Sequence, residues 1–147
     1  MTVIPDKDIQ SILNSALALA FPLMPIAWEN AGYVDPLNAD IKAPVLGTAY
    51  FRVILLPAEI DVITLGPSPW QERKGIFQVS VFHPMGIGFG IPKGKAAEVV
   101  AAFKAGTAFT YNTLRIVCEK AWPGSGRPED GWYHIPVNIR YHCDYQG

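Results

Sequence analysis

The stretch from Trp132 to Tyr145 alternates between two kinds of side chain along its whole length. The more apolar set is Tyr133, Ile135, Val137, Ile139, Tyr141, Cys143 and Tyr145, and the more polar set is Trp132, His134, Pro136, Asn138, Arg140, His142 and Asp144. Because successive side chains of a strand point to opposite faces, this pattern predicts one long strand with one face packed and the other more polar. A strand of this kind must lie in a sheet, so the fold has to be built around it.

Further strands are expected upstream, joined by short polar links as in a meander. They cover residues 26–29, 48–56, 61–66, 75–84 and 113–119. We expect Pro57 to end the second of these strands, because proline cannot donate to a ladder hydrogen bond. Residues 32–44 are expected to form an irregular loop.

Two segments have helical periodicity instead. Ile9, Ile12, Leu13, Ala16, Leu17 and Ala20 form one apolar face, with Asp6 placed to cap the helix and Pro22 to end it. The second helix spans about Pro92–Lys104, with a stripe of Ala96, Val99, Val100 and Phe103 and with Gly106 as its C-terminal glycine. The expected fold is therefore α+β: a single domain, 1–147, with an antiparallel or mixed sheet of about five to six strands and two helices packed against it.

Composition excludes several classes of protein. The formal net charge is −1, and lysines and arginines never form a run, so sequence-specific nucleic-acid binding is not expected. The first apolar stretch is periodic and follows acidic residues, so we expect neither a signal peptide nor a membrane span, and a cytoplasmic site of synthesis. Cys118 and Cys143 fall in strand segments and are expected to be free buried thiols.

A glycine-rich run, HPMGIGFGIPKGK from His83 to Lys95, resembles a phosphate loop that opens a helix. Its spacing fits neither G-x-x-x-x-G-K-[ST] nor G-x-G-x-x-G, because Phe89 stands where the first pattern needs glycine and Ala96 where it needs a hydroxyl. We therefore favour a flexible strand-to-helix connection, with Lys95 on a solvated helix face. A nucleotide-binding enzyme that uses the Gly86–Lys95 loop is the alternative.

No other catalytic or metal-binding pattern is visible. His134 and His142 share a strand face but lie about 26 Å apart at about 3.3 Å per residue, too far for one metal ion. A cysteine nucleophile paired with His83 stays open as a minor alternative. We expect no catalytic residue, no metal ion and no cofactor, and we take surface or half-buried histidines as the default.

Two polar segments carry aromatic or arginine side chains that suit protein contacts. They are residues 68–74, with Trp70 and Arg73, and residues 122–130, with Trp122 and Arg127. We expect both segments to be loops and at least one to lie at a contact with another subunit or partner. The alternative is that these tryptophans fold back over a sheet edge.

The order of motifs resembles the tail terminator family of long-tailed bacteriophages. WEN, YFRVILLP, GIFQVSVFHPMGIG, FKAGTAF and DGWYHIPVNIRYHCDY carry the resemblance, which covers nearly the whole chain. It implies a small α+β domain without catalytic residues, in which the glycine run 86–90 is a turn close to a neighbouring subunit. It also implies a homo-hexameric ring at the head-proximal end of the virion tail, which stops growth of the tail tube and docks the head-completion or connector protein, with DNA passing through. Another head–tail joining ring protein is the closest alternative.

Overall fold

The computed structural model describes residues 5–62, 65–67, 69–111 and 114–146, with two helices and eight strands among them. The elements in chain order are α1 (Pro5–Ala20), β1 (Ile26–Trp28), β2 (Gly32–Val34), β3 (Tyr50–Val62), β4 (Trp70–Pro84), α2 (Gly90–Ala102), β5 (Ala108–Tyr111), β6 (Leu114–Pro123), β7 (Arg127–Glu129) and β8 (Trp132–Gln146).

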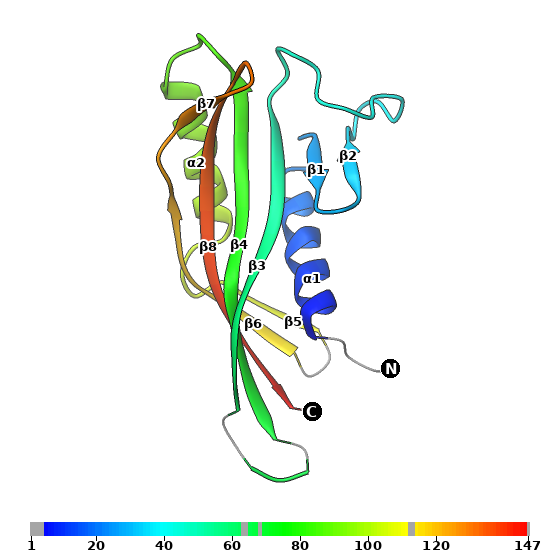
Figure 1. The fold of residues 1–147 in the computed structure, drawn as a ribbon, viewed down its shortest axis with the longest axis vertical. Coiled ribbons are helices and arrows are strands. Elements are labelled where there is room, and N and C mark those ends of the chain that lie inside the picture. The colour runs from blue at the N-terminus through cyan, green and yellow to red at the C-terminus, as the bar shows by residue number, and fades with distance from the viewer. Residues whose placement is uncertain (1–4, 63–64, 68, 112–113, 147) are drawn as a thin grey trace.

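The strands form one mixed, mostly antiparallel sheet. Its order is β2-β1-β3-β4-β8-β6-β5, with β7 paired to β8 beside this path, and only the β1–β3 pair is parallel. The long strands β3, β4 and β8 run through its centre, with α1 and α2 beside them (Figure 1). The predicted α+β class is confirmed, and the sheet has more strands than the five to six expected.

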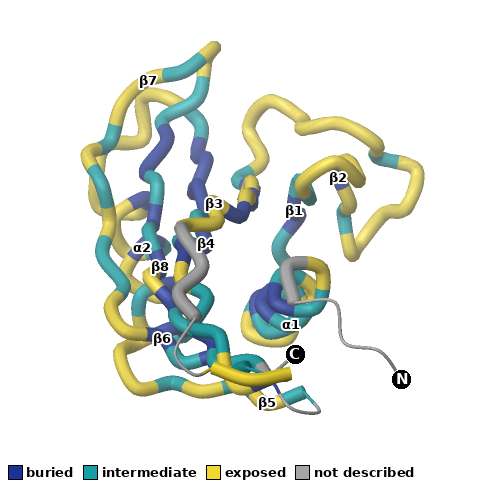
Figure 2. The backbone as a smooth tube through the Cα atoms, turned by 60° about the horizontal axis from the view of Figure 1, so that its bottom comes forward, coloured by how far each residue is buried: buried dark blue, intermediate teal, exposed yellow. Residues whose placement is uncertain are grey.

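The main core lies between the helices and one face of the sheet. The alternating apolar set of β8 is buried there from Ile135 to Cys143, as predicted. Leu13 and Leu17 of α1 and Val99 of α2 belong to the same buried cluster, so both helices cover the same face. Figure 2 shows the buried positions concentrated in the central strands and on one side of α1.

A smaller aromatic cluster lies on the opposite, helix-free face. Tyr50 of β3 stacks on Phe82 of β4 at 4.7 Å between ring centroids, and Tyr33 of β2 meets Tyr50 edge-on. Trp132 packs against Tyr50 at 5.1 Å. Trp132 is thus half-buried structural packing, in line with the alternative that a tryptophan folds back over the sheet.

The prediction that Pro57 ends a strand is wrong. β3 continues to Val62, so residues 61 and 62 of the strand expected over 61–66 belong to β3, and residues 65 and 66 are not in a strand. Residues 63 and 64 lie outside the described residues. Pro57 pairs with Gly75 on its β4 side, next to a register shift, whereas β1 pairs with β3 only at Phe51 and Arg52. The second edge of β3 is therefore unpaired at Pro57, and proline is tolerated at an edge or beside a bulge.

Three smaller differences from the expected elements concern β2 and β5, the start of α1 and the end of α2. The expected loop over residues 32–44 contains β2, and the unpredicted strand β5 precedes β6. The helix α1 begins at Pro5, so Asp6 does not occupy the capping position. Gly106 has φ +91° but lies beyond the cap of α2 at Phe103, and its N–H donates to the Cys118 carbonyl.

Gly75 occupies the tightest point of the central sheet. A Cβ atom there would lie 2.5 Å from the Tyr141 hydroxyl and 2.8 Å from the Leu56 carbonyl oxygen. Both distances are shorter than side chains tolerate, so only glycine fits between β3 and β8 without a shift of the neighbours.

Candidate interaction surfaces

The buried cysteines lack the character of nucleophiles. Cys118 and Cys143 are free and fully buried, as predicted. Burial raises the pKa of each thiol to about 11, so very little thiolate exists near neutral pH. Among the described residues, no three histidine, cysteine or acidic side chains are arranged to hold a metal ion.

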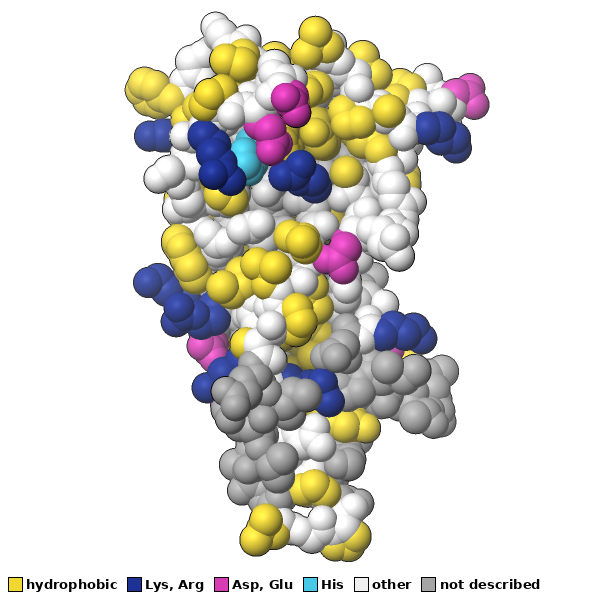
Figure 3. Space-filling view, in the orientation of Figure 1, with side chains coloured by type: hydrophobic (Ala, Val, Ile, Leu, Met, Phe, Trp, Pro, Cys, Tyr) yellow, Lys and Arg dark blue, Asp and Glu magenta, His cyan; other side chains and the backbone are white. Residues whose placement is uncertain are grey.

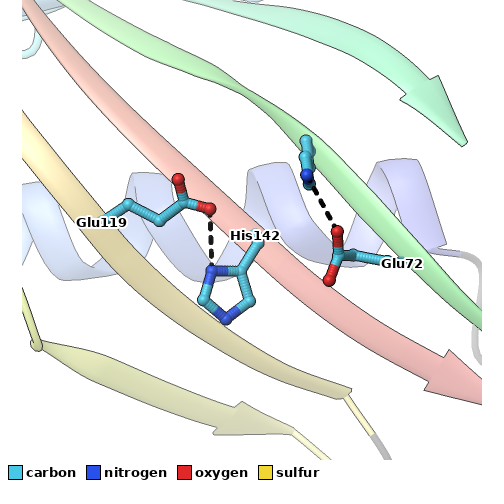
Figure 4. A network of polar contacts seen from close by, with 4 residues as sticks. Glu72, Glu119 and His142 are labelled. Atoms are coloured by element: carbon cyan, nitrogen blue, oxygen red, sulfur yellow. Dashed lines mark hydrogen bonds and ion pairs between the residues drawn. The ribbon is translucent and has the colours of Figure 1, made fainter. Parts of the chain in front are cut away.

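Two histidines are more buried than the sequence predicts. His83 and His134 are 4% and 2% exposed, and burial lowers the pKa of both. His134 stacks on Phe82 with 4.8 Å between ring centroids, so its ring is part of the aromatic cluster on the helix-free face. His142 is half-buried, and its Nδ1 lies 2.9 Å from Glu119 Oε1 (Figure 4).

The start of α2 does not have the features of a phosphate site. Its capping position is Phe89, which makes no side-chain hydrogen bond to the helix. Lys95 Nζ lies 2.9 Å from Glu98 Oε2 and 5.7 Å from the centre of the Phe21 ring. The expected solvated Lys95 is therefore only half-exposed, and its charge is already paired with a carboxylate.

The glycine-rich run instead forms an exposed apolar segment, residues 85–91, called the apolar loop here although its last two residues begin α2. Met85, Ile87, Phe89 and Ile91 are 52%, 42%, 68% and 62% exposed. Gly86 and Gly88 have φ values of +89° and +81°, where other residues are strained. Sequence reasoning noted the glycines and missed the large apolar residues between them, which were the available signal.

An uncharged groove lies between α1 and β5. It has a volume of about 560 Å³ and is lined by Ser11, Ser15 and Leu19 of α1 and by residues 108–111. Leu19 is 82% exposed at its rim. Among the described strands β5 pairs with β6 alone, so it forms one edge of the sheet. The groove could not be predicted because β5 was not.

The four predicted interface residues lie in strands rather than loops. Trp70 and Arg73 belong to β4, Trp122 to β6 and Arg127 to β7. Ser68, at the start of the first predicted loop, lies outside the described residues.

These four residues do not form one site. Trp70 pairs with Gln146 at one end of β8, and Arg127 pairs with His134 near the other end. The two positions are therefore about 40 Å apart along β8 at about 3.3 Å per residue. Arg73 is half-buried, and its Nη2 lies 3.4 Å from Gln71 Oε1.

Trp122 lies beneath two cations on the helix-free face. Lys120 Nζ and the Arg140 guanidinium each lie 5.4 Å from its ring centre, a cation–π arrangement. Ile54 and Leu56 of β3 are 39% and 43% exposed. Their alternation with the buried residues Val53 and Leu55 places them on this same face. Figure 3 shows apolar side chains gathered across the middle and upper parts of the molecule as viewed from this side.

Comparisons with known proteins give one clear assignment. A family model described as phage tail terminator protein matches residues 8–141. A solved structure, whose name states no role, is similar over 97% of this chain and 98% of its own, with 22% identity and a TM-score of 0.68. At that identity it supports the fold alone. No curated protein matches the sequence. Neither helix, within the described residues, has the length and apolar character needed to span a bilayer.

Proposed function

The chain belongs to the phage tail terminator family, because the family match covers nearly all of it, and from this premise we propose that it caps the tail tube as a ring. It is a structural component of the phage tail. In the proposed role, a homo-hexameric ring binds the head-proximal end of the tube, stops further polymerisation and docks the head-completion or connector protein. The family match over residues 8–141 is the observation that carries the proposal.

The physical requirements of such a cap are consistent with this domain. A tube grows when identical rings stack head to tail, so its cap must match the tube on one side and differ on the other. A rigid sheet with distinct surfaces at its ends can do this without chemistry. The buried thiols and the paired Lys95 lend no support to the alternative enzyme, so we propose a protein without catalytic activity or cofactor.

Trp70, Arg73, Trp122 and Arg127 remain our proposed partner contacts. Because Trp70 and Arg127 lie near opposite ends of β8, they belong to two different contacts. One assignment consistent with this is a contact with the tube at one end and with the connector at the other. Trp122, with Lys120 and Arg140 over its ring, is the most hot-spot-like of the four.

Electron microscopy of lysates from a phage that lacks this gene tests the role. We expect tails that are overlong or ragged, and normal length when the wild-type chain is supplied in trans. Normal tails with empty joints would overturn termination and support a head–tail joining ring. Size-exclusion chromatography with light scattering, with and without nucleotide, tests the enzyme alternative. A monomer stabilised by nucleotide would favour it.

A further inference from the structure

The apolar loop exposes an unusually large hydrophobic surface for a loop in contact with solvent. Four large apolar side chains stand out of it, and no charged residue occurs between His83 and Lys93. Within the described residues, nothing lies within 4 Å of a Cβ atom placed on Gly86 or Gly88, so there is open space beside both glycines. Exposed apolar patches of this kind mark binding surfaces.

The groove between α1 and β5 has the complementary character. Its lining residues carry no charge and are mostly apolar, and it is a shallow, open groove. The apolar loop leads into α2 at the top of Figure 1, whereas β5 lies low in the same view. One copy therefore cannot place its own loop in its own groove, but a neighbouring copy can.

The areas involved make the apolar loop one part of a larger contact. Phe89 exposes on the order of 130 Å², given that an aromatic side chain buries about 150–250 Å² when covered. With its three apolar neighbours the loop offers roughly 400 Å², about half of the ~800 Å² that each partner buries in a stable interface. The rest of the interface between two copies must come from surfaces around the loop and the groove.

We propose that the apolar loop of one copy inserts into the α1–β5 groove of the next copy, and that this is the subunit contact of the ring. The inference rests on the proposed ring. Because loop and groove are different surfaces of one chain, the contact is head-to-tail and generates a closed ring when the rotation between copies closes. Phe89 is the anchor, as the largest and most exposed side chain of the loop.

Site-specific cross-linking tests the contact. Two full-length variants, Phe89→Cys and Ser15→Cys, are mixed and oxidised, and the products are separated without reductant. Ser15 lines the groove and is exposed, and the native cysteines are buried with thiols whose pKa is about 11, so they stay inert. We expect a cross-linked heterodimer in the mixture, and a ladder that ends at the ring size when one chain carries both substitutions.

Leu37→Cys mixed with Ser15→Cys is the matched control, because Leu37 is 73% exposed but lies in the loop after β2. Equal cross-linking of the control and test pairs would overturn the proposed contact. In a second assay, Phe89→Asp should weaken assembly by about thirtyfold or more, as truncating a hot spot does, whereas Leu37→Asp should have little effect. A folded Phe89→Asp chain that assembles like wild type would also overturn it.

These results separate the contact from the role. Rings that form without the Phe89–Ser15 cross-link refute the loop-in-groove contact and leave the ring intact. A wild-type chain that forms no ring and fails to restore tail length refutes the proposed function itself.

Discussion

Replacing Ile139 tests whether the buried face of β8 carries the stability of the domain. Ile139 is fully buried in mid-strand, paired with Phe77 of β4 and Ala121 of β6. Truncation to alanine removes three buried carbons and leaves a cavity, which costs about 2–5 kcal/mol in a core, and truncation to valine costs about 0.5–1.5 kcal/mol. Ile139→Asp should abolish folding, because it buries an unpaired charge.

Urea unfolding followed by circular dichroism at fixed protein concentration measures these costs. With an m-value of about 2 kcal/mol per molar urea, the midpoint should fall by roughly 1–2.5 M for Ile139→Ala and by about 0.5 M for Ile139→Val. The protein concentration is held constant because assembly would stabilise the folded state by mass action.

Arg140→Ala is the matched control, since Arg140 is the next residue along the strand and is exposed on the opposite face. Its loss removes one cation over Trp122 and should cost at most about 1 kcal/mol. If Ile139→Ala and Arg140→Ala unfold at the same urea concentration, the assignment of the two faces of β8 is wrong.

Three further outcomes are expected. Trp70→Ala and Arg127→Ala should each keep the fold by circular dichroism, and the double variant should lose tail capping; a double variant that still restores tail length would show that these positions are ordinary surface. Lys95→Ala should leave assembly unchanged and lower the free energy of unfolding by at most about 1 kcal/mol, because the ion pair of Lys95 with Glu98 is partly exposed. If the wild-type chain binds a nucleotide and this variant does not, the structural role is refuted. The free energy of unfolding should fall as the pH drops below about 6.5, the pKa of histidine in the unfolded chain. His83 and His134 have lowered pKa values in the folded state, so below that pH the unfolded chain binds more protons than the folded chain. A His134→Gln variant whose stability has the same pH dependence as wild type in urea titrations would contradict this.

The parts of the fold that sequence predicts well are those where one face is buried throughout. The β8 alternation and the stripe of Ala96, Val99 and Phe103 each face a single core, so the pattern of apolar residues follows the geometry directly. The α+β class follows from these elements. These elements can be predicted without knowing which distant residues pack against them.

Prediction fails where pairing, rather than burial, makes the strand. Residues 70–74 are polar and lie between prolines and a glycine, which is typical of a turn, yet they pair with β3 on one side and β8 on the other. β5 is a four-residue strand whose partner is an adjacent segment. Such strands depend on backbone hydrogen bonds supplied by neighbours, and these leave little trace in side-chain composition.

The contacts assigned to Trp70, Arg73, Trp122 and Arg127 stay a prediction. The apolar loop was not predicted as a surface, because its exposed residues are ordinary core types. Only the structure shows that Met85 and Phe89 stay exposed, although Lys93 Nζ lies 5.2 Å from the centre of the Phe89 ring.

Gly75 has a consequence for how sequences with this fold can change. Its missing side chain is space that the Tyr141 hydroxyl and the Leu56 carbonyl already occupy. A smaller residue at position 141 would relieve only the contact with the tyrosine hydroxyl, because the Leu56 carbonyl belongs to the backbone and stays in place whatever side chain stands at 141. A side chain at position 75 therefore requires β3 to move away from β4. Within the family, glycine at 75 should persist even in sequences that have lost the tyrosine at 141.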